Sequence, residues 1–201
     1  AISYHNYTKN FEGSVVSVEW KDASTLLYCS MESVDVTLRQ QKIGDDTNQL
    51  VLEGGKVVFN GFSTAQGKVV FSGNTQQHPN ELFSFDLKKK NLAKFTDLNP
   101  WIRDKKSGKQ EKISYKSRDG ITIDGVLIYP ADYKSGIKYP LISLIHGGPE
   151  ACLQNGWQTY YSRWGQVAAG KGYFVFMPNY RGSAGRGVAF SKMDQGDMGD
   201  E

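Results

Sequence analysis

Two segments in the first hundred residues repeat one pattern about 43 residues apart. Residues 26–30 (LLYCS) match residues 69–73 (VVFSG) in residue type. Each is followed by a polar turn, a strand with alternating apolar residues and a short apolar segment. A four-stranded propeller blade occupies about 40–45 residues. The repeat therefore favours two blades of a β-propeller over its alternative, two hairpin pairs of a β-sandwich.

The whole first half has this β character. Runs rich in β-branched, aromatic and leucine residues alternate with turn-rich stretches such as GDDTN and NTQQHPN, and none of the runs has a helical period. The expected strands cover residues 25–31, 34–43, 56–62, 67–73 and 81–88. We therefore expect antiparallel sheets, and no helical domain, up to about residue 98.

The pattern changes after residue 98, where a proline and a charged stretch predict a linker. Asp119-Gly120 between two alternating runs, 112–116 and 121–129, is a strong hairpin signal. Strand and helix then alternate, as in an α/β sheet. The expected elements are a buried strand over 141–145, a helix over 156–169 and a buried strand over 173–177, and we expect the two strands to be neighbours.

The strand over 141–145 ends in His146-Gly147-Gly148-Pro149. Ligands and chemistry in open α/β sheets collect beyond the carboxyl ends of the strands. Acyl transfer needs backbone N–H groups aimed at the oxygen where negative charge develops, and glycine leaves that approach free of a side chain. Gly147 and Gly148 are therefore candidate oxyanion-hole residues, and a plain tight turn is the alternative interpretation.

The last ninety residues resemble the start of the catalytic domain in the prolyl oligopeptidase family of serine peptidases. The resemblance runs from ISYKSRDGITIDGVLIYP through the His-Gly-Gly-Pro loop and GKGYFVFMPNYRGSAGRGVAF to DQGDMGDE. The His-Gly-Gly-Pro form is closer to the acylaminoacyl-peptidase and dipeptidyl-peptidase branches, because other branches have tyrosine at position 146. The first hundred residues resemble the family only loosely.

The resemblance implies a β-propeller followed by an α/β-hydrolase domain. Residues 1–103 would form the C-terminal blades of the propeller, and residues 104–201 the N-terminal portion of the catalytic domain. The family's serine, aspartate and histidine follow downstream of the matched region, and no Gly-x-Ser-x-Gly occurs in the 201 residues. We therefore expect an internal piece of a larger enzyme, truncated before the nucleophile and inactive alone.

Several other residues have a structural and a functional interpretation. His146 is at the wrong chain position for the triad histidine; it shapes or borders the site, or is a hydrogen-bonded structural residue. The Arg181–Gly187 stretch lacks a nucleotide-binding spacing and is interpreted as a structural loop near the site. The acidic residues after 193 lack the calcium-loop pattern and predict a solvated turn. Trp157 and Trp164 are expected in the core.

Composition and charge argue against several classes of partner and cofactor. The net charge of +3, from 24 basic and 21 acidic residues, is too small and too scattered to indicate nucleic acid as a partner. No apolar stretch is long enough for a membrane span, and no targeting segment is recognisable. Three histidines without cysteines at ligand spacing argue against structural zinc. We expect no cofactor and no metal, and the compartment, oligomeric state and substrate preference stay open.

Three functions follow from these observations. The leading one is a peptidase that hydrolyses short peptides through an acyl-enzyme, of oligopeptidase, acylaminoacyl-peptidase or dipeptidyl-peptidase type. An esterase uses the same loop, but a preceding propeller disfavours it. The third is a non-catalytic fragment, because a chain without a serine nucleophile forms no acyl-enzyme.

Overall fold

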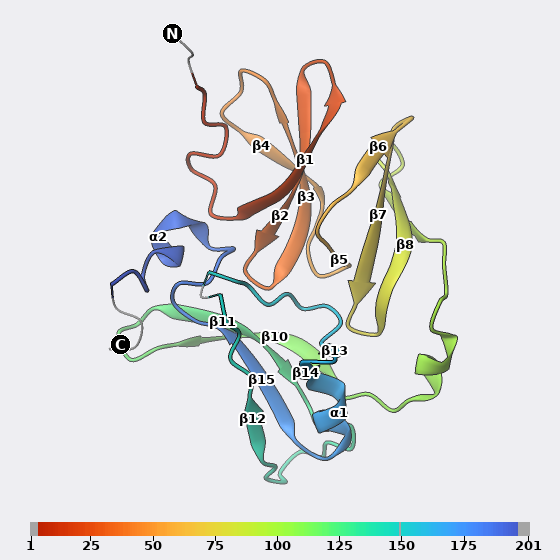
Figure 1. Ribbon diagram of the computed structural model, residues 1–201, viewed down its shortest axis with the longest axis vertical. Helices are drawn as coiled ribbons and strands as arrows, with labels where there is room; N and C mark the ends of the chain where they lie inside the picture. The colour runs from red at the N-terminus through yellow and green to blue at the C-terminus, as the bar shows by residue number, and fades with distance from the viewer. Residues whose placement is uncertain (1–3, 149, 197–201) are drawn as a thin grey trace.

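The computed structural model describes residues 4–148 and 150–196, and it is mostly β-sheet with few helices (Figure 1). Two antiparallel sheets from the first half lie side by side, and a third, mixed sheet from the second half lies below them in this view. The connection from the second sheet to the third runs along one side of the molecule. The expectation of antiparallel sheets without helices in the first half is confirmed.

The first sheet is a four-stranded antiparallel meander in the order β1-β2-β3-β4. The predicted strands over 25–31 and 34–43 correspond to β2 and β3. The strand before them was not predicted. The bounds are β1 Ser14–Asp22, β2 Thr25–Glu32, β3 Asp35–Lys42 and β4 Asn48–Leu52.

The second sheet has the order β5-β7-β8-β9, with β6 also paired to β7. The predicted strand over 56–62 is mostly wrong, because only two of its residues pair with β7. The next pairing begins at Ser63, so residues 60–62 leave the ladder. The bounds are β5 Val58–Phe59, β6 Ser63–Ala65, β7 Lys68–Thr75, β8 His78–Asp86 and β9 Asn91–Lys94.

A hydrophobic core joins these two sheets. It contains the alternating inward residues of β2, β3, β7 and β8, and the rings of Phe59, Phe71 and Phe83 stack in sequence with centroids 4.2 and 5.8 Å apart. Burial of large aromatic side chains dominates the stability of such a core. The 43-residue repeat therefore corresponds to two similar sheets that share one core.

A connector that contains a 3-10 helix, Pro100–Asp104, leads to the third sheet. This sheet has the order β10-β11-β15-β12; β15 is antiparallel to β11 and parallel to β12. The Asp119-Gly120 hairpin and the neighbouring strands predicted over 141–145 and 173–177 are confirmed. The bounds are β10 Gln110–Lys116, β11 Thr122–Ile128, β12 Leu141–Ser143 and β15 Phe174–Asn179.

Two expectations for this half are wrong in part. The predicted helix over 156–169 begins only at Gly165: residues 159–164 form the small hairpin β13 (Thr159–Tyr160) and β14 (Arg163–Trp164), followed by α1 (Gly165–Gly170). The backbone N–H groups of Asn155 and Trp157 donate to Val34 and Asn74 of the first half, which fixes the path of the chain just before this hairpin. A short helix, α2 (Gly187–Ser191), follows β15.

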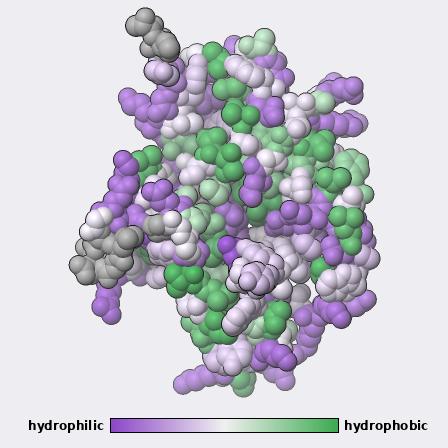
Figure 2. All heavy atoms as spheres, viewed as in Figure 1, coloured by the Kyte–Doolittle hydropathy of each residue, from purple (hydrophilic) through white to green (hydrophobic). Residues whose placement is uncertain are grey.

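The second expectation that is wrong in part is the buried strand over 141–145: the strand exists, but its end residues are exposed. Leu141 and Ile145 are 58% and 64% exposed, and among the described residues β12 pairs only with β15. Apolar residues are visible over both the upper sheets and the lower sheet in Figure 2. The apolar residues therefore predicted the strand correctly, but they did not predict that Leu141 and Ile145 are exposed.

One hairpin tip joins the first sheet to the core of the third. Val34, in the turn between β2 and β3, is fully buried in a cluster with residues of β11, β15 and α1. Its carbonyl accepts a hydrogen bond from the Asn155 N–H at 2.6 Å. The Ser33 N–H donates to the Gly185 carbonyl, and the Ser33 hydroxyl donates to Asp124. The two halves are thus packed together by side-chain and backbone contacts.

Candidate active site

The His-Gly-Gly loop and the segment after β15 lie at one edge of the third sheet. Because β12 and β15 are parallel, their carboxyl ends point the same way. The Leu144 N–H continues the ladder by donating to the Phe176 carbonyl at 2.9 Å, and the chain then turns at His146. This is the edge at which α/β sheets collect ligands.

His146 is held by residues that follow β15. Its ring stacks on Tyr180 with centroids 4.5 Å apart, and its Nε2 lies 3.0 Å from the hydroxyl of the fully buried Ser183. The Tyr180 hydroxyl donates to the His146 carbonyl. Burial lowers the pKa of His146; the contact with the Gly147 carbonyl opposes this shift, and the nearby Arg163 charge adds to it. The imidazole is therefore neutral at pH 7 and is fixed in orientation.

The two glycines differ in what their positions require. Gly148 has φ +143, and a Cβ there would lie 2.6 Å from the Ala151 nitrogen. At Gly147 an added Cβ would meet nothing within 4 Å, and φ is not in the region reserved for glycine. The backbone therefore requires glycine only at position 148; at position 147 there is room for a side chain.

A hollow of about 270 Å³ lies beside this loop. His146, Gly147 and Arg163 line it, and Leu144, Leu153 and Met177 supply apolar walls. The Arg163 guanidinium donates to the Gln158 side chain at 3.1 Å and lies over the Tyr160 ring. Sequence reasoning did not identify Arg163 because the segment was interpreted as a regular helix.

The segment after the loop is fixed by both halves of the chain. The Cys152 thiol donates to the Ser33 carbonyl at 2.9 Å, and the Asn179 side chain bonds both the N–H and the carbonyl of Leu153. Burial raises the pKa of the Cys152 thiol to about 12, so this cysteine is a protonated structural residue. Both cysteines are free thiols. The loop is therefore anchored on the first sheet.

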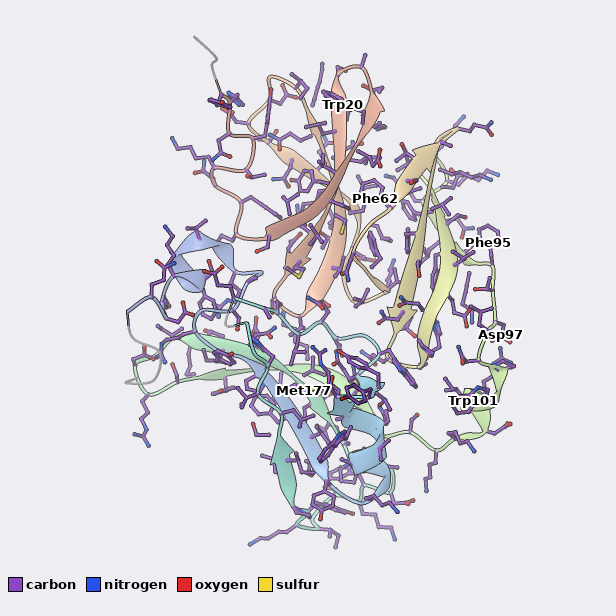
Figure 3. All side chains as sticks on the ribbon, viewed as in Figure 1. Trp20, Phe62, Phe95, Asp97, Trp101 and Met177 are labelled. Carbon is purple, nitrogen blue, oxygen red and sulfur yellow. The ribbon has the colours of Figure 1, made fainter. Side chains whose placement is uncertain are left out.

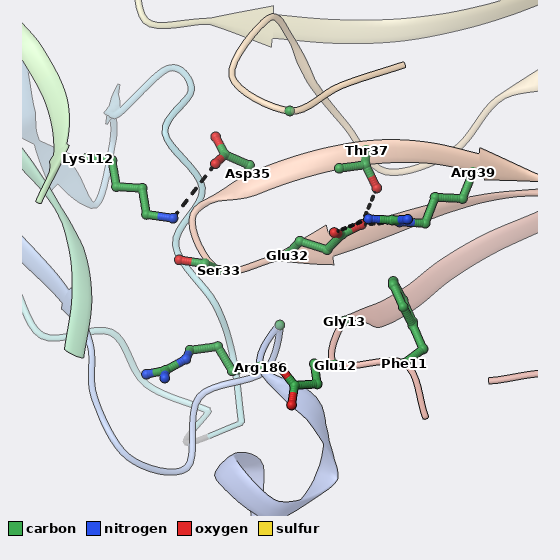
Figure 4. A pocket seen from close by; sticks show the side chains of 12 residues that line it. Phe11, Glu12, Gly13, Glu32, Ser33, Asp35, Thr37, Arg39, Lys112 and Arg186 are labelled. Carbon is green, nitrogen blue, oxygen red and sulfur yellow. Dashed lines mark hydrogen bonds and ion pairs between the residues drawn. The ribbon is translucent and has the colours of Figure 1, made fainter. Parts of the chain in front are cut away.

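A second, charged cavity of about 570 Å³ lies at the junction of the halves (Figure 4). Arg39 makes a two-point contact with Glu32, and Lys112 lies 4.0 Å from Asp35. Burial raises the pKa of Asp35. Acidic and basic side chains thus face one another across this cavity, and it presents no single charge to a ligand.

The remaining sequence candidates are placed as follows. Trp164 is 59% exposed, so its expected core position is wrong: it ends the small hairpin instead of lying on a helix face. Trp157 is half-buried. Of the acidic residues after 193, only Asp194 lies within the described residues; it packs against Gly182.

In the described part of the chain, no three His, Cys, Asp or Glu side chains are grouped as metal ligands. No helix there is long and apolar enough to cross a membrane.

Comparisons with known proteins agree on one family, although no family model matches the sequence. The chain is 30% identical to the uncharacterized peptidase YuxL of Bacillus subtilis over 195 residues, which is 96% of this chain and 27% of that protein. It is 28% identical to dipeptidyl-peptidase 5 of Porphyromonas endodontalis over 82% of this chain and 23% of that protein. The chain thus spans about a quarter of the length of these relatives.

Solved structures of peptidases have the same fold. An acylaminoacyl peptidase of Pyrococcus horikoshii superposes with a TM-score of 0.74 and 26% identity, covering 93% of this chain and 28% of that one. An acylaminoacyl peptidase in complex with Z-Gly-Gly-Phe-chloromethyl ketone gives a TM-score of 0.73 and 27% identity, covering 92% and 28%.

Proposed function

The chain belongs to the prolyl oligopeptidase family of peptidases, and from that membership we propose that it is part of a serine peptidase that hydrolyses short peptides through an acyl-enzyme. The Bacillus subtilis peptidase matches 96% of this chain, and the Porphyromonas endodontalis peptidase matches 82% of it. The peptide chloromethyl ketone bound to the acylaminoacyl peptidase supports a peptide as the substrate class.

The same proposal assigns the two halves. Residues 1–103 are the C-terminal blades of a β-propeller, supported by two similar antiparallel sheets that share a core. Residues 104–201 are the N-terminal portion of an α/β-hydrolase domain, supported by the mixed sheet with its parallel pair. The Val34 contact with the second core supports a fixed placement of one half on the other.

The observation that carries the proposal is the loop after β12. His146, Gly147 and Gly148 lie at the carboxyl edge of parallel strands, and His146 and Gly147 line a hollow there. In the proposed reaction, a backbone N–H of Gly147 or Gly148 stabilises the oxyanion of the tetrahedral intermediate, which is worth roughly 3–4 kcal/mol for one such donor. The neutral His146 shapes the loop through Tyr180 and Ser183.

The nucleophile is not in these 201 residues, because the sequence contains no Gly-x-Ser-x-Gly. A serine-directed fluorophosphonate probe tests this. We expect no labelling of the 201-residue chain, and stoichiometric labelling of the natural protein that contains it. Labelling of the 201-residue chain would refute the assigned position of the nucleophile, and an unlabelled natural protein would refute the serine mechanism.

A substrate comparison then separates peptidase from esterase activity. The natural protein should hydrolyse a peptide anilide, offered with a blocked and with a free amino terminus, to the peptide acid and the free aniline, which leaves as the protonated amine. A simple p-nitrophenyl ester serves as the matched substrate. Hydrolysis of the ester without any cleavage of peptide anilides would favour the esterase alternative.

A further inference from the structure

A further hollow lies away from the candidate active site, against the connector between the second and third sheets. Its volume is about 630 Å³. Three segments far apart in sequence enclose it: the turn between β7 and β8 with the end of β9, the connector from Asp97 to Ser107, and the residues around α1. Figure 3 shows Asp97 and Trp101 on the connector at the side of the molecule.

The walls are apolar and aromatic. Trp101 and Ile102 of the connector face the hollow together with Trp157 and Val167 of the second half. A pocket of about 300–1,000 Å³ with apolar walls and a few polar groups is typical of small-molecule sites, and such sites are frequent where domains meet. Two indole rings offer large flat surfaces for stacking against an aromatic ring.

The charge around this hollow is positive. Asp97 is compensated by both Arg103 and Lys94, and Lys106 pairs with Asp132. Within the described residues, Lys105 has no carboxylate within 4.0 Å of its ammonium. An anionic group that enters the hollow would therefore gain a cation that is not already neutralised.

The hollow is held open by contacts that do not depend on a ligand. The Gln166 side chain in α1 accepts from the Gly108 N–H at 2.7 Å and donates to the Gly108 carbonyl at 3.1 Å. Gly108 fits tightly there, since a Cβ would lie 1.9 Å from the Tyr129 carbonyl oxygen. The Trp157 N–H bonds to Asn74 of the second sheet at 2.8 Å. Pre-formed walls reduce the ordering cost of binding.

We propose that this hollow binds a small aromatic carboxylate. The aromatic ring lies against Trp101 and Trp157, and the carboxylate pairs with Lys105. The site is separate from the His146 loop, so this inference does not depend on the proposed peptidase function.

The test is a titration of the protein with indole-3-acetate, followed by saturation-transfer NMR. A ligand of this size should bind with a Kd of about 1 mM or tighter. The neutral analogue indole-3-acetamide should bind about threefold more weakly or worse, because the charge-assisted contact with the exposed Lys105 is lost. An acid and an amide that bind equally would overturn the assignment of the anion site.

Two matched variants locate the binding. Trp101→Ala should weaken binding at least tenfold, while Trp20→Ala should leave Kd within twofold; the two indoles are 57% and 58% exposed, and Trp20 lies on β1, outside the residues that line the hollow. Lys105→Ala should weaken binding of the acid but not of the amide, and Lys138→Ala should change neither. Equal effects of Trp101→Ala and Trp20→Ala, or no binding at all, would overturn the proposal.

Discussion

Val34→Ala tests whether the hairpin tip of the first sheet is a structural part of the second core. The Val34 side chain is fully buried among β11, β15 and α1, although its neighbours in sequence belong to the first sheet. The substitution removes two methyl groups and leaves the hydrogen bond between the Asn155 N–H and the Val34 carbonyl in place. Its effect therefore reports on side-chain packing alone.

The expected cost follows from the buried volume. Loss of two methyl groups from the core costs about 1.6 kcal/mol at about 0.8 kcal/mol each. A residual cavity of up to about 40 Å³ adds about 1 kcal/mol at about 24 cal/mol per Å³. The free energy of unfolding should therefore fall by about 1.5–3 kcal/mol, depending on how far the neighbours relax into the space.

Urea unfolding measures the magnitude, and hydrogen exchange measures the location. Val36→Ala is the matched buried control, because Val36 is 1% exposed in the first core; Val18→Ala, at a 56% exposed position, is the surface control. Val34→Ala should speed amide exchange in β11 and β15, and Val36→Ala in β2 and β3. The reasoning is refuted if Val34→Ala costs no more than Val18→Ala, or if its faster exchange is confined to the first sheet.

Three further outcomes are expected. Gly148→Ala should lower the unfolding free energy by about 1–3 kcal/mol, because it forces φ +143 on a non-glycine residue, whereas Gly147→Ala should be nearly neutral; equal urea midpoints would contradict the backbone geometry. Burial lowers the pKa of His146 below its unfolded value of about 6.5, so the unfolded chain binds the proton more readily. The stability that His146 contributes is therefore present above about pH 6.5 and falls as the pH drops toward the lower folded pKa; His146→Gln should remove that part of the pH dependence of the urea midpoint. Burial also raises the pKa of both cysteine thiols, that of Cys152 to about 12, so iodoacetamide at pH 8 should alkylate Cys29 and Cys152 only in urea, and alkylation of the native chain, seen by mass spectrometry, would show that the loop opens.

The candidate site was only partly predictable from the sequence. The strand end before His146 and the neighbouring strand over 173–177 were correctly expected, because a short apolar run followed by glycines is a local signal; their parallel orientation comes from the structure. The contacts of His146 with Tyr180 and Ser183, and the place of Arg163 in the hollow, depend on segments more than fifteen residues away. No local pattern encodes them, and the roles assigned to Gly147 and Gly148 stay predictions.

The sequence by itself determined where most strands lie, because alternating side chains and turn residues act through short-range sterics and hydrogen bonds. β2, β3, β7, β8 and the Asp119-Gly120 hairpin follow from such patterns. Only the tertiary structure decided that Val34 belongs to the second core and that the residues before Gly165 are not helical. In both cases residues of the first two sheets, distant in sequence, supply partners: the Val34 carbonyl accepts from the Asn155 N–H, and the Asn74 side chain accepts from the Trp157 N–H, so these two backbone donors are satisfied across the junction of the halves.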